Sequence, residues 1–331
     1  MMETAWPFYL SALAAGAAFG YVTQRGGFCL MRALSNLVLM GDATILRAYA
    51  LALLVAMAGV QVLMVSGLVD IPIRPFHWMS NMIGGLLFGA GMVLGGGCSG
   101  STWYRIGEGA IGAWVVVLGF AMGATTVRLG ALGAARAALQ APSFTIGGSP
   151  PTLANLSGLS PWIVILALAA AALPWLLRAR SEPQHGKWPW AVTGAAVGIL
   201  IAGGWWASGF GDRAVGLTFA VNTGELLTYP LVGFPNRVNW SMVMLLGVPV
   251  GAFAAARRSG EFRWKLPPGW SLVKIFAGGL LMGSSAILAE GCNITQGLTN
   301  GATLALGSLT ALASMLAGGW LTLWTLYLRK G

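Results

Sequence analysis

Three cysteines, Cys29, Cys98 and Cys292, carry the most distinctive chemistry in this chain of 331 residues. A free thiol donates a weak hydrogen bond and, once ionised, is a nucleophile. Each cysteine lies beside a glycine or within an apolar run, and the three are far apart in the sequence. An odd number cannot all pair within the chain, and the sequence has no Cys-x-x-Cys spacing of the kind that binds zinc. We therefore expect free thiols, with no metal ion and no cofactor.

Two of these cysteines end a segment that occurs twice. Residues 84–98 read GGLLFGAGMVLGGGC and residues 278–292 read GGLLMGSSAILAEGC, an offset of 194 positions with eight of the fifteen residues identical. One interpretation is a pair of duplicated packing helices whose cysteines are small buried hydrophobes. A packing helix needs no thiol at its broken end, however, so the repeated thiol favours a site. The candidate site residues are Cys29, Cys98 and Cys292, the glycines Gly97 and Gly291, the polar residues Ser99 and Asn293, and the arginines Arg25 and Arg105.

The composition predicts the solvent in which these residues lie. Hydrophobic residues make up 56% of the chain and charged residues only 8%, and the mean hydropathy is +0.75. Soluble domains carry about 25% charged residues, so the composition indicates an all-α integral membrane protein within the lipid bilayer. The net charge of +10 does not indicate nucleic-acid binding, because the basic residues are scattered through short loops.

The hydropathy pattern predicts about nine transmembrane helices. A helix needs about 20 apolar residues to cross a bilayer. Residues 24–39 and 209–239 are too polar and too interrupted to face lipid, so we expect re-entrant or broken helices there. Residues 128–160 read as a long loop, and His77 and His185 as ordinary loop histidines. The predicted spans are residues 6–22, 45–69, 79–97, 110–127, 161–177, 188–208, 241–256, 272–291 and 303–328.

The duplication and the charge pattern together predict a topology. We interpret residues 1–331 as a single membrane domain, with a first repeat over 1–127, a connecting loop and helix over 128–187, and a second repeat over 188–331. Four spans, one connecting span and four spans give inverted-topology repeats, the architecture of many secondary transporters. Three segments on one predicted side hold nine of the nineteen Lys and Arg residues. The positive-inside rule then places the C-terminus in the cytoplasm and the N-terminus outside.

The residues around the cysteines resemble a known family. The run from Gln24 to Cys29, the block from Gly97 to Gly109 and the block from Gly291 to Ile294 are similar to the three cysteine motifs of the YeeE/YedE membrane proteins, and the likeness covers essentially the whole chain. The resemblance implies a bacterial inner-membrane transporter, not an enzyme, that takes up thiosulfate or a related inorganic sulfur anion past three free cysteines. It also implies a small cytosolic sulfur-carrier protein resembling TusA as a partner.

The chemistry of the candidate residues suits such an anion. An anion entering hydrocarbon must exchange its hydration water for fixed donors, because unpaired charge in the bilayer is costly. Neutral thiols are weak donors that can hold a soft sulfur atom and release it again. A helix that begins just after Cys98 or Cys292 adds backbone N–H groups and its positive dipole end.

Two alternatives remain open at the level of the sequence. An ionised cysteine could form a persulfide, which would make the protein a membrane sulfurtransferase. Alternatively, the chain could form a less selective channel for anions or selenium compounds. The sequence contains no phosphate-binding loop of the Gly-x-x-x-x-Gly-Lys-Ser/Thr type, so we do not expect this chain alone to pump with ATP.

Overall fold

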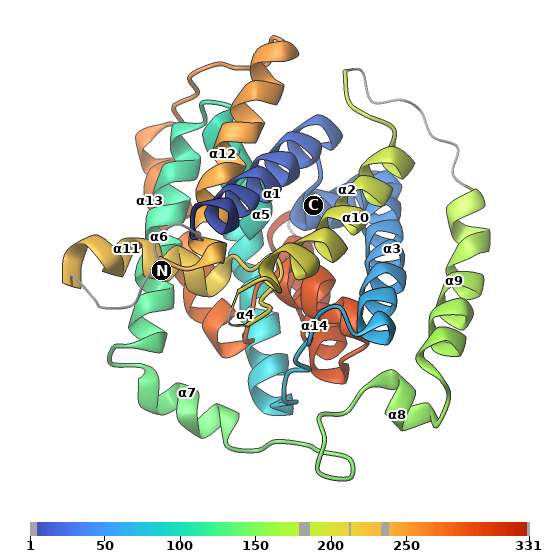
Figure 1. The fold of residues 1–331 in the computed structure, drawn as a ribbon. Coiled ribbons are helices and arrows are strands. Elements are labelled where there is room, and N and C mark those ends of the chain that lie inside the picture. The colour runs from blue at the N-terminus through green and yellow to red at the C-terminus, as the bar shows by residue number, and fades with distance from the viewer. Residues whose placement is uncertain (1–4, 179–185, 212, 233–237, 330–331) are drawn as a thin grey trace.

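The computed structural model describes residues 5–178, 186–211, 213–232 and 238–329. Within these ranges the fold is entirely helical, as expected of an all-α integral membrane protein (Figure 1). The long helices are α1 (Ala5–Gly26), α3 (Thr44–Ser66), α4 (Trp78–Gly95), α6 (Ile111–Arg128), α9 (Pro161–Leu177), α10 (Trp190–Ser208), α12 (Trp240–Arg258), α13 (Gly269–Leu288) and α14 (Leu306–Leu323). The short elements are α2 (Leu30–Met40), α5 (Ser99–Gly107), α7 (Gly133–Gln140), α8 (Leu153–Ser157), α11 (Ala220–Val232), η1 (Thr295–Asn300), η2 (Gly301–Thr303) and η3 (Trp324–Leu328).

A long helix lies over each of the nine predicted spans. Seven helical segments in the described ranges are long and apolar enough to cross a membrane, counting α4 with α5 and α14 with η3 as continuous. The remaining two are α9, which is apolar but has only 17 residues, and α1, whose C-terminal turn carries Gln24 and Arg25. The integral membrane fold is therefore confirmed, whereas the number of spans stays a prediction.

The helices pack in pairs that match between the two halves of the chain. Helix α1 packs on α12 as α10 packs on α3, and α6 packs on α13 as α14 packs on α4. Helices α4 and α13, which carry the duplicated segment, pack on each other. Glycines at intervals of four allow these contacts, because a Cβ at Gly16 or Gly20 would overlap the backbone of α12, and one at Gly85 or Gly89 would overlap α14.

The connection between α6 and α9 differs from the prediction. Residues 128–160 were expected to form a loop, but they contain α7 and α8 at one end of the molecule (Figure 1). The sequence of α7, GAARAALQ, is rich in alanine, the residue with the highest helix propensity. Helix α8 is bounded by Thr152, whose hydroxyl accepts a hydrogen bond from the Asn155 amide, and by Gly158 in the left-handed conformation. Local propensity and capping thus give helices where glycine, proline and serine indicated only a loop.

The two interrupted stretches each hold a short helix. Helix α2 begins within residues 24–39 and ends one residue beyond them, at Met40, and α11 lies within residues 209–239. Helix α1 also runs four residues beyond the predicted end of the first span, through Arg25 to Gly26. In the duplicated segments α4 ends at Gly95 and α13 ends at Leu288, so each helix is interrupted a few residues before its cysteine, Cys98 or Cys292. Short helices therefore begin near all three cysteines.

Candidate functional site

Cys29 and Cys98, each at the start of a short helix, lie close together. We call the interruption between α4 and α5, at Cys98, the first break, and the interruption after α13, at Cys292, the second break. Cys29 directly precedes α2 and Cys98 directly precedes α5. The Cys29 thiol donates to the Ser101 hydroxyl over 3.1 Å, and this hydroxyl donates to the Cys98 carbonyl over 2.9 Å. The Cys98 thiol lies beside that of Cys29. Ser101 therefore links the Cys29 thiol to the backbone of Cys98, which lies 69 positions later in the sequence.

Both of these short helices begin without a side-chain cap. Neither Cys29 nor Cys98 makes a side-chain hydrogen bond to the first turn of the helix that it precedes. The first N–H groups of an α-helix have no intrahelical partner and carry the positive end of the helix dipole. The backbone at each break therefore offers N–H donors to an anion next to a thiol.

The second break places Cys292 among polar groups from both halves of the chain. Its thiol lies 3.4 Å from the Thr295 hydroxyl, and its carbonyl accepts the Gln296 amide over 2.7 Å. The next residue, Asn293, accepts a hydrogen bond from the Ser99 hydroxyl on its side-chain oxygen over 3.1 Å and one from the Tyr49 hydroxyl on its carbonyl over 2.6 Å. The Asn293 amide nitrogen is buried and has no partner among the described residues, so it is a spare donor beside Cys292.

The three thiols are free and all three are buried. Their exposed fractions are 4% for Cys29, 1% for Cys98 and 0% for Cys292. Ser99 and Asn293, which hydrogen-bond each other, are 194 residues apart, the same offset that relates the two duplicated segments. The two breaks therefore meet at equivalent positions, with Cys98 and Cys292 directly before the paired residues.

A cavity of about 600 Å³ leads to Cys29, and we call it the Cys29 cavity. It opens at the C-terminal ends of α1 and α12, where Gly27 and Gly260 line its wall. Its charged lining residues are Arg32, Arg105, Glu108, Lys187, Glu261, Arg263 and Lys265, so five cationic side chains face two carboxylates.

A second cavity, of about 700 Å³, leads toward Cys292, and we call it the Gly291 cavity. It opens at the other ends of α1 and α12, where Tyr9 and Trp240 line its wall. Gly291 and Thr295 reach its inner surface, although Cys292 between them is fully buried. Its charged lining residues are Arg74, Arg128, Arg136, Arg213, Glu225 and Glu290, so arginines are again in excess.

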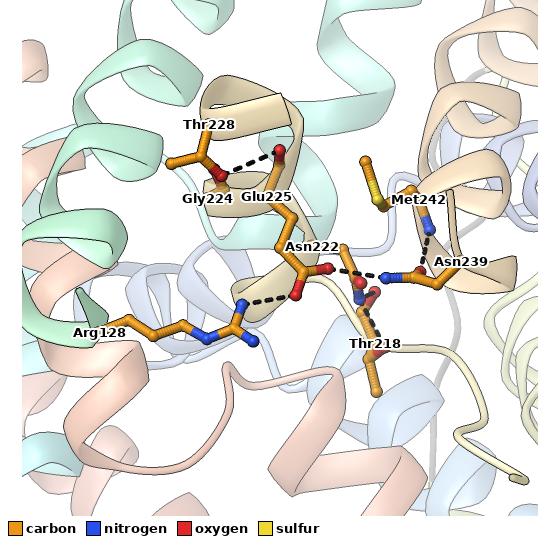
Figure 2. A network of polar contacts seen from close by, with 8 residues as sticks. All are labelled: Arg128, Thr218, Asn222, Gly224, Glu225, Thr228, Asn239 and Met242. Atoms are coloured by element: carbon orange, nitrogen blue, oxygen red, sulfur yellow. Dashed lines mark hydrogen bonds and ion pairs between the residues drawn. The ribbon is translucent and has the colours of Figure 1, made fainter. Parts of the chain in front are cut away.

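A polar network ties the short helix α11 to its neighbours at the wall of the Gly291 cavity (Figure 2). The Glu225 carboxylate accepts from the Arg128 guanidinium of α6 over 2.6 Å and from the Asn239 amide over 2.7 Å. Asn239 also caps α12, because its side-chain oxygen accepts the Met242 amide over 2.9 Å. One carboxylate on α11 thereby connects α6, α11 and the start of α12.

The structure brings most of the predicted site residues together, but not all. Gly97 and Ser99 flank Cys98, Gly291 and Asn293 flank Cys292, and Arg105 lines the Cys29 cavity while donating to the Gly96 carbonyl over 3.0 Å. Arg25 is different: it lies at the end of α1, is absent from the cavity walls, and its carbonyl accepts the Trp188 amide. The histidine prediction holds in part, since His77 lies in a loop but contacts Glu290, whereas His185 lies outside the described residues.

Sequence reasoning missed several polar residues of the site. Ser101 and Thr295 contact the thiols, and the Tyr49 hydroxyl bonds the backbone of the second break. A signal existed for Tyr49, because a phenol inside the predicted span 45–69 needs a polar partner. Glu225 and Arg128 carried no such signal, since their pairing joins residues 97 positions apart.

Comparison with known proteins adds a family and named relatives. A family model described as sulphur transport matches residues 25–321. The thiosulfate transporter TsuA of Spirochaeta thermophila is 31% identical over 329 residues, covering 96% of this chain and 99% of that protein. The protein of the same name from Escherichia coli is 30% identical over 338 residues, covering 97% and 95%. The probable transporter YedE of Salmonella typhimurium is 33% identical over 117 residues, covering 34% of this chain and 28% of that protein.

Proposed function

This chain belongs to the sulphur transport family, the YeeE/YedE proteins, and from that membership we propose that it takes up thiosulfate through a pathway lined by its three cysteines. The chain is a membrane transporter of a sulfur compound and not an enzyme. The two relatives that match over nearly their whole length are both named thiosulfate transporters, and we therefore propose thiosulfate as the substrate.

The observation that carries the pathway is the position of the two cavities. They open at opposite ends of α1 and α12, and the wall of one contains Cys29 while the other ends at Gly291 and Thr295 beside Cys292. Cys98 and the hydrogen-bonded pair of Ser99 and Asn293 lie between them. An anion that follows this line meets Cys292 first from one side and Cys29 first from the other.

Hydrogen bonding by neutral thiols is the mechanism we favour. The Cys29 thiol contacts the Ser101 hydroxyl and lies beside the Cys98 thiol, and the Cys292 thiol contacts the Thr295 hydroxyl. Hydroxyls donate and accept hydrogen bonds but are weak bases. Thiosulfate carries a soft terminal sulfur and three oxygens, so the thiols suit its sulfur while backbone N–H groups and the spare amide of Asn293 suit its oxygens. Several weak sites in series allow the anion to enter and to leave.

The proposed orientation places the Cys29 cavity in the cytoplasm and the Gly291 cavity outside. Lys187 belongs to the first predicted cytoplasmic loop and Glu261 to the second, and their side chains are 2.7 Å apart. Leu323, at the end of α14, packs with Leu34 of α2, a helix whose residues Arg32 and Ser35 line the Cys29 cavity. These contacts support one common side for the three basic segments, and the positive-inside rule makes that side cytoplasmic.

The same pairing of helices supports two inverted repeats over residues 1–127 and 188–331. Exchange of the halves turns the contact of α1 with α12 into that of α10 with α3.

As a partner we propose a small cytosolic carrier protein resembling TusA, which would take up sulfur at the cationic rim of the Cys29 cavity in a bacterial inner membrane. Co-purification of such a carrier with the wild-type protein, but not with a Lys265→Glu variant, would support this partner.

Transport by the purified protein tests the function. In liposomes, we expect uptake of sulfur-labelled thiosulfate to exceed that of sulfate at least about tenfold, because sulfate lacks the soft sulfur that the thiols contact. Imposing an ion gradient across the same liposomes identifies the driving force. The matched control is a Cys98→Ala variant reconstituted to the same density. Equal transport of both anions, or transport that survives Cys98→Ala, would reject the proposed selectivity.

A further inference from the structure

Glu290, directly before Gly291 and Cys292, has an unusual backbone. Its φ is 60°, in the left-handed region, which it shares only with Leu304 among the described residues that are not glycine. The position equivalent to Glu290 in the first repeat is residue 96, which is a glycine with φ of 70°. Glycine adopts this conformation freely, whereas a residue with a Cβ does so at a cost. The second break therefore has the same left-handed backbone conformation as the first, although glutamate, unlike glycine, disfavours it.

The Glu290 side chain explains how this conformation is held. Its carboxylate lies 2.9 Å from His77 Nδ1, at the start of α4, and the side chain is 19% exposed at the wall of the Gly291 cavity. Two neighbours of His77 hold the same segment, since Ser80 donates to the Leu288 carbonyl over 2.5 Å and Asn81 to the Ala289 carbonyl over 3.1 Å. The start of α4 thus contacts three consecutive residues, 288–290, at the end of α13.

We propose that Glu290 is a positioning residue: held by His77, it keeps the break in the left-handed conformation that turns Cys292 away from the Gly291 cavity. Cys292 is fully buried although Gly291, directly before it, and Thr295, three residues after it, line that cavity. The first break needs no such contact because Gly96 takes the conformation unaided. The proposal rests on Cys292 lying on the pathway, and it adds the group that controls access to it.

Glu290→Ala and Glu290→Gly make the matched test, because both remove the carboxylate and only glycine keeps the left-handed conformation without strain. The readout is the rate at which a small neutral alkylating reagent modifies Cys292, followed by peptide mass spectrometry in the otherwise unchanged full-length protein. We expect Glu290→Ala to raise this rate at least about fivefold, because alanine disfavours the left-handed region. Glu290→Gly should stay within about twofold of the wild-type rate, because glycine adopts that region freely. The modification rate of Cys29, on the other cavity, should not change.

His77→Ala separates the hydrogen bond from the backbone. It should raise the Cys292 rate in the wild-type background and have no effect in the Glu290→Gly background. Equal rates in the alanine and glycine variants, in either direction, would overturn the proposal, as would a His77→Ala effect that persists with glycine at position 290. The alkylation readout does not involve thiosulfate, so a wrong substrate would leave it valid, while uptake measured on the same variants reports on the transport proposal separately.

Discussion

At the scale of single residues, the site combines soft thiols with hydroxyl neighbours. Ser101 joins Cys29 to the backbone of Cys98, and Thr295 lies against Cys292. Cys29 lines an open cavity, whereas Cys98 and Cys292 are enclosed by protein. The three cysteines should therefore differ in how well they tolerate substitution.

Serine and alanine substitutions test what each thiol supplies. Serine keeps a donor but loses the large, polarisable sulfur, and alanine loses both. Cys29→Ser should keep several-fold more thiosulfate uptake than Cys29→Ala, because one hydrogen bond is worth about 1 kcal/mol. At Cys98 and Cys292 we expect both substitutions to abolish uptake, since the enclosed sites cannot adjust to a shorter side chain.

Intact-mass spectrometry of the wild-type protein during turnover checks the non-covalent mechanism. Hydrogen-bonded transport predicts no change in mass, whereas an obligatory persulfide adds one sulfur atom to a cysteine. The wild-type protein is denatured without reductant before the measurement, so that any persulfide is retained. A gain of one sulfur on any of the three cysteines would replace the relay by sulfur transfer.

At the scale of elements, the structure shows which parts of the site the sequence could predict. The helix ends near Cys98 and Cys292 were predictable because Gly97 and Gly291 interrupt apolar runs, and the breaks at 24–39 and 209–239 because charges cannot face lipid. The contacts of Tyr49 with Asn293 and of Arg128 with Glu225 were not, since they join residues 244 and 97 positions apart. Which helices meet depends on tertiary packing that no local pattern contains.

Gly96→Ala tests the conformation of the first break. No atom lies within 4 Å of a Cβ at this position, so the added methyl group does not collide with the protein and destabilises it through the left-handed φ of 70°. We expect a loss of stability of about 1 kcal/mol and a marked loss of uptake. Gly67→Ala is the control, because Gly67 has φ of 66° and equal space but ends α3 away from the cysteines. It should show a similar thermal shift with normal uptake; equal uptake in the two variants would contradict the prediction.

Glu261 links two loops to the end of α1 and makes stability depend on pH. Partial burial raises the pKa of this carboxyl, but hydrogen bonds from Lys187 and Gln24 and the charge of Arg25 outweigh it and hold the pKa below the ordinary 4.5. A lowered pKa in the folded state stabilises the protein above the unfolded value, and this stability is lost as the pH falls through the folded value. Glu261→Gln should therefore lower the melting temperature at pH 7 and have progressively less effect below pH 4.5.

Tryptophan fluorescence during thermal unfolding measures this difference in detergent. Glu108→Gln is the matched comparison, since Glu108 accepts from the same Gln24 amide over a longer distance, 3.3 Å against 2.6 Å for Glu261. A melting difference for Glu261→Gln that is the same at pH 7 and at pH 4 would show that the ion pair with Lys187 does not stabilise the fold.

At the scale of the whole molecule, two cationic cavities face away from each other across a narrow buried centre. Each has more arginine and lysine than glutamate in its wall. Such mouths concentrate anions from solution on both sides, while the direction of net transport follows from gradients or from consumption of the product. In the proposed pathway, the orientation of the protein in the membrane then decides which cavity receives the substrate.

Cysteine labelling in intact cells tests the orientation. With an impermeant reagent, Ser259→Cys should not be labelled, because residue 259 follows α12 beside the Cys29 cavity, on the proposed cytoplasmic side. Ser149→Cys should be labelled, because it is exposed in the loop between α7 and α8, and α7 lines the Gly291 cavity. The reverse pattern would invert the topology. The alternative position Ser181 lies outside the described residues.

The hydrogen bond between Ser99 and Asn293 joins two residues at equivalent positions of the duplicated segments. In a homodimer with a two-fold axis, a residue on the axis contacts its own copy. An ancestor of half this length, assembled as such a pair, would have placed the same side chain on both sides of this contact. In this chain the two positions differ, because Ser99 donates with its hydroxyl and Asn293 accepts with its amide oxygen. The bond therefore has a direction at a contact that would have none in an exactly symmetric pair.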